Sequence, residues 1–171
     1  FGFAAQNGIK AWSAHKRVRM MNPKGSGSSA CKSSAVEDQP VCEAEDMLLK
    51  ANWRGMFMIE LLRDVSNKIW FMELNGRSWG SMALALRMAY EYPLWNIRQT
   101  LDPSFCPEAP APCPPIICRH LGREIIHILQ VLRGPHSSAI PNWPSIAQTL
   151  SAALRISKND RWYNWRPGKT T

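Results

Sequence analysis

The stretch Gly55–Gly80 reads GMFMIELLRD (55–64), VSNK (65–68) and IWFMELNGRSWG (69–80). Two apolar, aromatic-rich runs flank Ser66-Asn67, a pattern typical of a β-hairpin with a tight loop. If the loop consists of these two residues, Glu60 lies directly opposite Glu73, and Asn75 lies on the same face. A three-residue loop would shift the register and break this pairing.

Both faces of the predicted hairpin are apolar, which indicates central strands covered on both sides. One face carries the two glutamates with Met56, Met58, Leu62, Ile69 and Phe71. The other carries Phe57, Ile59, Leu61, Trp70, Met72 and Leu74. Two facing carboxylates repel each other and lose hydration, so something must neutralise them. Mg²⁺ would do so, and so would an arginine such as Arg77; the residues alone leave both open.

Glu60, the run Glu73-Leu74-Asn75-Gly76-Arg77, and Trp79-Gly80-Ser81 together resemble the metal-binding end of the ATP-grasp fold. The resemblance is to the branch that contains the carbamoyl-phosphate synthase large subunit, and it extends from Phe1 to about Pro103. The family pattern is an acidic residue on one strand and Glu-x-Asn-x-Arg on the next. The resemblance implies ATP and Mg²⁺ as cofactors. It implies Glu60, Glu73 and Asn75 as metal ligands and Arg77 as a catalytic residue that stabilises the transferring phosphoryl group.

The same resemblance implies nucleotide contacts from Arg17, Ser28 and Ser29. Arg17 belongs to a polar, basic strand face, and the serines end the loop Lys24–Ser29, which reads KGSGSS. From the residues alone, a solvated strand face and a flexible linker explain these stretches as well. The loop also lacks the Gly-Lys-Ser/Thr ending of a Walker A motif.

The rest of the chain predicts an α+β fold. Two strand-like runs, 1–6 and 9–20, flank Asn7-Gly8, a strong hairpin signal. Helices are expected over 36–52, 82–89, 92–101, 116–132 and 144–156. We expect an antiparallel sheet of about four strands with packed helices in residues 1–103, and a proline-rich linker with a helical extension in 104–171. The helix over 116–132 has one apolar stripe, which indicates packing into a core: Ile117, Leu121, Ile125, Ile128 and Leu132.

The composition is that of a globular protein of 171 residues, 45% apolar, with a formal charge of +8. No run of 18 apolar residues occurs, so we expect no membrane partner. Five cysteines without Cys-x-x-Cys spacing indicate reduced thiols and a cytoplasmic location. A zinc site formed by Cys106, Cys113, Cys118 and His120 is conceivable, but their spacing matches no standard pattern.

The positive charge is compatible with nucleic acid, a membrane surface or a phosphate-rich small molecule. Because the basic residues are spread out, we expect a nucleotide rather than nucleic acid as the partner. The tail Arg161–Arg166 reads RWYNWR. It could stack on bases or dock on its own domain, and docking is the preferred interpretation.

By resemblance, the chain is part of an ATP-dependent, Mg²⁺-requiring carboxylate–amine or carboxylate–thiol ligase that acts through an acyl phosphate. Its substrates would be ATP and a small carboxylate. The N-terminal ATP-grasp half, which supplies the adenine pocket, is not in the sequence. We therefore expect a fragment of a longer protein that is inactive alone and self-associates as a homodimer. The alternative is a non-enzymatic basic module that binds nucleic acid or serves, as a degenerate ATP-grasp half, in subunit association.

Overall fold

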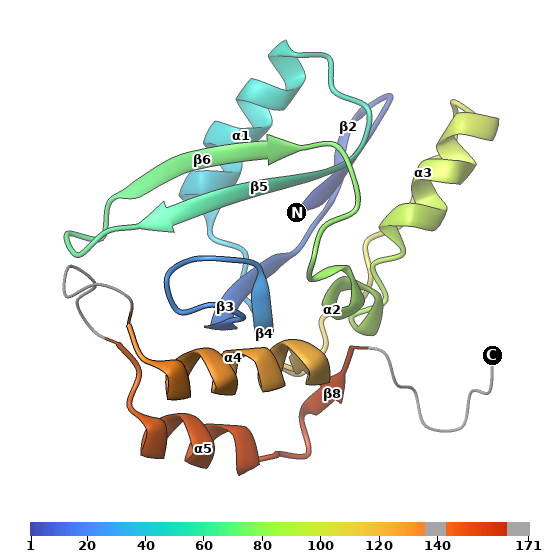
Figure 1. Ribbon diagram of the computed structural model, residues 1–171. Helices are drawn as coiled ribbons and strands as arrows, with labels where there is room; N and C mark the ends of the chain where they lie inside the picture. The colour runs from blue at the N-terminus through green and yellow to red at the C-terminus, as the bar shows by residue number, and fades with distance from the viewer. Residues whose placement is uncertain (136–142, 164–171) are drawn as a thin grey trace. The chain divides into compact units, whose positions relative to one another are not determined.

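The computed structural model describes residues 1–135 and 143–163 (Figure 1). The chain divides into two compact units, and each is described by itself. The first unit comprises residues 1–14 and 34–113, and the second comprises residues 15–33 and 114–171. The described residues form two four-stranded sheets, mostly antiparallel, and five helices. A mixed α and β architecture is therefore confirmed, although the sequence does not indicate that residues 15–33 group with the C-terminal part.

The sheet of the first unit has the order β2-β1-β5-β6, and each neighbouring pair is antiparallel. Its strands are β1 (Gly2–Ala5), β2 (Gly8–Trp12), β5 (Gly55–Arg63) and β6 (Ile69–Asn75). The predicted hairpin around Asn7-Gly8 is confirmed. Gly8 follows the turn with a φ of 100°, a conformation that favours glycine.

Helices cover both faces of this sheet near β1 and the start of β5. On one face, α1 (Asp38–Lys50) packs Leu48 against Ala4 and Phe57. On the other face, α2 (Met82–Arg87) and α3 (Tyr92–Leu101) close a larger aromatic cluster. That cluster contains Phe3, Ala11, Met58, Trp79, Met82, Ala85, Tyr92 and Trp95. This double cover explains why β5 begins with apolar residues on both sides.

The far half of the β5–β6 hairpin is not covered in this way. Strand β6 is at the edge of the sheet, and Trp70, Phe71 and Met72 are 47%, 55% and 56% exposed. The prediction of central strands buried on both sides is therefore wrong for this half. Apolar residues on both faces of a strand are buried only where other parts of the chain pack on both faces. Here the described packing ends near Glu60.

The sheet of the second unit has the order β3-β4-β7-β8. Its strands are β3 (Ala14–Met20), β4 (Ser28–Ser34), β7 (Ile117–Arg119) and β8 (Asp160–Trp162). Strands β4 and β7 are antiparallel, and β7 and β8 are parallel. Two helices accompany this sheet, α4 (Leu121–Arg133) and α5 (Ile146–Leu154).

The helix predicted over 116–132 differs from the structure in two ways. Its first residues form β7, and the helix begins after His120, whose ring Nδ1 accepts a hydrogen bond from the backbone N–H of Arg123. Its apolar stripe also faces outward, since Leu121, Ile125 and Leu132 are 61%, 50% and 53% exposed. The prediction of core packing is therefore wrong, because ion pairs hold the opposite face of α4 against the sheet.

Candidate functional site

The β5–β6 hairpin aligns the predicted metal ligands. Glu60 lies directly opposite Glu73, and Met58 lies opposite Asn75, so the two glutamates and Asn75 share one face of the sheet. This register is the predicted one. It is reached differently, however, because the loop is one residue longer than expected and the register shifts again between Glu60 and Leu61.

The loop consists of three residues, Val65 to Asn67, and Asn67 takes a positive φ of 68°. The bulge at Met72 then compensates for the extra loop residue. Between the loop and the bulge, Leu62 lies opposite Trp70 and Leu61 lies opposite Phe71. Trp70 and Phe71 have therefore exchanged faces relative to the sequence prediction.

Asp64 organises the loop. Its Oδ1 accepts hydrogen bonds from the Ser66 N–H, the Ser66 hydroxyl and the Lys68 N–H, at 2.6–3.0 Å. Its Oδ2 accepts one from the Trp70 indole at 2.8 Å. The hydrogen bonds from the Ser66 hydroxyl and the Trp70 indole lower the pKa of the Asp64 carboxyl to about 2. These hydrogen bonds favour the ionised form of the carboxyl, and they link Asp64 to Ser66, Lys68 and Trp70 across the loop.

The three predicted ligands differ in exposure. Glu60 and Asn75 are half-buried, whereas Glu73 is exposed. The Asn75 Nδ2 is buried and finds no hydrogen-bond partner among the described residues. Buried amide atoms are normally paired, so an unpaired one leaves a position that a water, an ion or a ligand could fill. Rotation of this amide by half a turn exchanges Nδ2 for Oδ1, an oxygen that suits a hard cation.

A rigid turn follows Asn75. A Cβ on Gly76 would lie 2.8 Å from Cζ2 of Trp53, so only glycine fits there without movement. Trp79 is 5% exposed and stacks on Phe1 at 4.6 Å between ring centroids. Between these two anchors, Arg77 is exposed and donates a hydrogen bond to the Ser78 carbonyl at 3.2 Å. Arg77 therefore lies two residues beyond Asn75, on a turn that packs against Trp53 and continues into the buried Trp79.

The donor set formed by Glu60, Glu73 and Asn75 consists of two carboxylates and one amide. No group of three or more His, Cys, Asp or Glu side chains that could hold a metal occurs in the part of the chain that the structure describes. Two carboxylates with an amide oxygen suit Mg²⁺, which keeps waters and substrate phosphates in its remaining positions.

The three predicted nucleotide-binding residues lie in the second unit. Arg17 is exposed on β3, and Ser28 is half-buried at the start of β4, where its carbonyl accepts a hydrogen bond from Arg123. Ser29 is 1% exposed. A side chain so enclosed does not meet solvent, whereas Arg17 and Ser28 do. The loop before Ser28 contains a β-turn in which the Gly25 N–H donates a hydrogen bond to the Asn22 carbonyl.

An ionic cluster that the sequence analysis did not foresee occupies the interior of the second unit. The Glu124 carboxylate accepts hydrogen bonds from Arg19 at 2.6 and 3.1 Å and from Arg119 at 2.8 and 3.2 Å. Arg119, 3% exposed, also reaches Asp160 at 3.2 Å. Burial alone would raise the pKa of the Glu124 carboxyl, but hydrogen bonds from neighbours that include Arg19 and Arg119 outweigh burial and lower it to about 2. The sequence does contain a clue to this cluster, because Glu124 and Asp160 are the only acidic residues in the basic segment 109–171.

The cysteines and the tail give simpler outcomes. Cys31 and Cys118 are buried, and the other three cysteines are exposed. The described part of the tail, up to Tyr163, pairs β8 with β7 of its own unit, and the Arg119 guanidinium lies 5.4 Å from the Trp162 ring centroid. Docking on its own unit is therefore confirmed for these residues, and residues 164–166 lie outside the described part.

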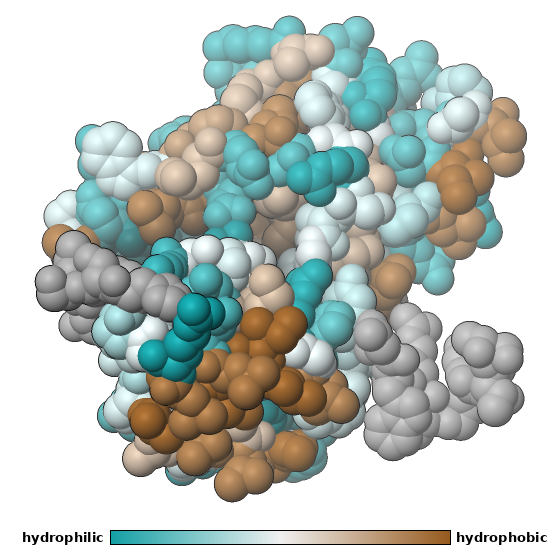
Figure 2. Space-filling model, viewed as in Figure 1, coloured by the Kyte–Doolittle hydropathy of each residue, from teal (hydrophilic) through white to brown (hydrophobic). Residues whose placement is uncertain are grey.

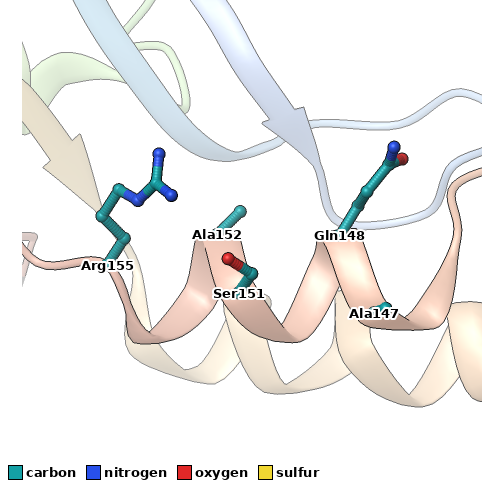
Figure 3. A pocket seen from close by; sticks show the side chains of 5 residues that line it. All are labelled: Ala147, Gln148, Ser151, Ala152 and Arg155. Atoms are coloured by element: carbon teal, nitrogen blue, oxygen red, sulfur yellow. The ribbon is translucent and has the colours of Figure 1, made fainter.

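A shallow depression on α5 carries no recognisable chemistry. It is lined by residues on one side of the helix (Figure 3): Ala147, Gln148, Ser151, Ala152 and Arg155. It has one charged side chain and no second titratable group, so it does not compete with the hairpin as a functional site.

Comparison with known proteins finds no matching family model, no matching curated protein and no matching solved structure.

Proposed function

We propose that this chain is the metal-binding part of an ATP-grasp ligase, which activates a carboxylate with ATP and Mg²⁺ for attack by an amine or a thiol. The observation that carries the proposal is the alignment of Glu60, Glu73 and Asn75 on one face of the hairpin, with Asn75 Nδ2 unpaired. Two carboxylates that lie opposite each other repel, and a bound cation would relieve that repulsion.

In this proposal, Glu60, Glu73 and Asn75 hold Mg²⁺, which when bound neutralises the phosphate oxygens of ATP. Arg77 stabilises negative charge on the transferring phosphoryl group, and the fixed turn between Trp53 and Trp79 keeps its backbone in place. The contribution of these residues is positioning and charge neutralisation, which dominate catalysis of phosphoryl transfer.

The resemblance covers one half of an ATP-grasp domain, so the proposal concerns a protein that also carries the other half. The isolated chain would bind Mg²⁺ weakly and would not turn over ATP. Its exposed hairpin residues, such as Trp70 and Phe71, would be available for self-association.

The test uses the longer protein with ATP, Mg²⁺, a panel of small carboxylates and hydroxylamine, which traps an acyl phosphate as a hydroxamate. We expect carboxylate-dependent hydroxamate formation that Glu73→Gln abolishes. Glu91→Gln, another exposed glutamate of the first unit, should leave it unchanged. Dimerisation without hydroxamate from any carboxylate would instead support a degenerate half used in subunit association.

A further inference from the structure

Helix α4 turns its polar side into the second unit and its aliphatic side to solvent. Glu124 faces inward to Arg19 and Arg119, and His127 Nδ1 lies 2.7 Å from the Met20 carbonyl oxygen. The outward residues are leucines and isoleucines that are 41–61% exposed: Leu121, Ile125, Ile126, Leu129 and Leu132. The ion pairs fix this orientation, because rotating the aliphatic residues inward would expel a carboxylate from two arginines.

Helix α5 extends the same surface. It packs beside α4, where the Trp143 indole reaches the Val131 carbonyl at 3.4 Å. It exposes Ile146, Leu150 and Leu154 at 47%, 41% and 81%. Figure 2 shows hydrophobic side chains gathered over α4 and α5. We call these exposed residues of the two helices the α4–α5 face. Contiguous apolar surface of this kind marks an interaction site.

The charge of the second unit is strongly one-sided. Residues 15–33 and 114–171 contain thirteen lysines and arginines and two acids, Glu124 and Asp160, which gives a formal charge of +11. Both acids are bonded to Arg119, so neither offsets the exposed basic groups. Residues 1–14 and 34–113 carry −3, and the two values sum to the +8 of the chain. The basic character is therefore concentrated in the unit that exposes the aliphatic surface.

Exposed basic residues lie at or follow the C-terminal ends of α4 and α5 in the chain. Arg133 ends α4, Arg155 follows α5, and Lys158 comes three residues later; all three are exposed. Exposed leucine and isoleucine with basic residues nearby in the chain suit the interface of an anionic membrane. There the aliphatic residues enter the acyl boundary, and the basic groups reach the lipid phosphates.

We propose that the α4–α5 face docks the second unit on an anionic lipid surface. A second copy of the chain would satisfy the aliphatic residues but would bring two units of +11 together. A nucleic acid would satisfy the charge but offers little to a leucine and isoleucine surface, since single strands are bound by stacking and duplexes through their phosphates. An anionic bilayer satisfies both features.

This mode of binding needs no spanning segment. No helix in the described ranges is long and apolar enough to cross a bilayer. Helix α4 has 13 residues, too few to span but enough to lie in the interface plane. The sequence-based expectation of no membrane partner rested on the lack of a span, and it does not bear on docking at the surface.

The test is flotation of the 171-residue chain with vesicles of phosphatidylcholine alone and with added phosphatidylglycerol. We expect partition that depends on phosphatidylglycerol and weakens as salt is raised. The variant Ile125→Gln/Leu129→Gln should lose at least about tenfold in partition, because two exposed aliphatic side chains no longer enter the bilayer. Its fold should persist, since both side chains are exposed and glutamine favours helix. Circular dichroism and the thermal midpoint check this.

The matched control is Leu61→Gln/Leu62→Gln on the hairpin, where the side chains are 42% and 55% exposed. This variant should partition like the parent. The proposal is overturned if the parent binds no vesicles, or if both double variants lose partition equally. It is also overturned if the face serves another partner. That result would be a dimer, or retention on duplex DNA, that Ile125→Gln/Leu129→Gln abolishes, in either case without vesicle binding.

Discussion

Glu60 on β5 lies directly opposite Glu73 on β6, and the register shifts immediately beyond this pair, between Glu60 and Leu61. The loop and the bulge are thus matched: one residue added at the loop is offset by one residue at Met72. Two carboxylates kept in opposition by such a bulge, with Asn75 beside them, form the arrangement on which the proposed metal site depends.

The opposed glutamates should cost stability when no cation is present. We expect Glu73→Gln to raise the free energy of unfolding by about 0.2–1 kcal/mol in metal-free buffer, because a like-charge pair directly opposite is removed. The same variant should lose the stabilisation that the parent gains from added Mg²⁺. Urea denaturation with and without Mg²⁺ measures both. A loss of more than about 1 kcal/mol in metal-free buffer would show that Glu73 has a structural partner instead.

The turn after Asn75 should depend on glycine. Gly76→Ala places a methyl group 2.8 Å from the Trp53 ring and should destabilise the protein by about 1–3 kcal/mol. Gly27→Ala is the matched control, because its Cβ would meet no atom closer than 3.9 Å. Thermal unfolding of the two variants gives the comparison. Equal midpoints would mean that the Trp53 ring moves aside freely and that the turn is not held as described.

Arg77 should matter for turnover and not for folding. It is exposed and donates a hydrogen bond to the carbonyl of the neighbouring Ser78, so Arg77→Ala should change stability by less than about 0.5 kcal/mol. In the longer protein, turnover should fall at least about 100-fold with little change in nucleotide affinity. Arg54→Ala, which removes an exposed arginine bonded to the Trp53 carbonyl, is the control. Unchanged turnover would remove Arg77 from the catalytic residues.

The buried cluster around Glu124 should make stability depend on acid pH. The pKa of the Glu124 carboxyl is about 2 in the folded protein, against an ordinary value of 4.5. The stabilising contribution of this carboxylate is therefore complete above pH 4.5 and is lost as the pH falls toward 2. Glu124→Gln should cost about 3–5 kcal/mol at pH 7, because two arginines lose their carboxylate. The free energy of unfolding, measured by denaturation at several pH values from 7 downward, should fall less steeply for this variant than for the exposed control Glu108→Gln. Parallel curves would contradict the assignment.

The sequence predicted the local structure well and the exposure of its apolar residues poorly. The Asn7-Gly8 hairpin, α1 and α3 follow from turn residues and helical periodicity, which act over a few residues. The outward stripe of α4 does not follow from them, because its orientation is set by Glu124 meeting Arg19, which lies 105 residues earlier. Periodicity reveals that a helix is two-sided, and a distant charge decides which side is buried.

The candidate site was predicted for a partly wrong reason. The pairing of Glu60 with Glu73 was inferred from a two-residue loop, and it holds because Met72 bulges to offset a three-residue loop. The positive φ of Asn67 and the bonds to Asp64 set that loop length, and neither can be read from an apolar pattern. The unpaired Asn75 amide is likewise a property of packing.

The most direct test of the proposed metal site is a titration of the 171-residue chain with Mn²⁺ in place of Mg²⁺, followed by paramagnetic broadening of backbone amide resonances. We predict broadening at concentrations on the order of millimolar, centred on Glu60 and on Glu73 to Arg77, that excess Mg²⁺ reverses. The double variant Glu60→Gln/Glu73→Gln should show none of it. Broadening centred elsewhere on the chain, or broadening at the hairpin that the double variant retains, would contradict the account.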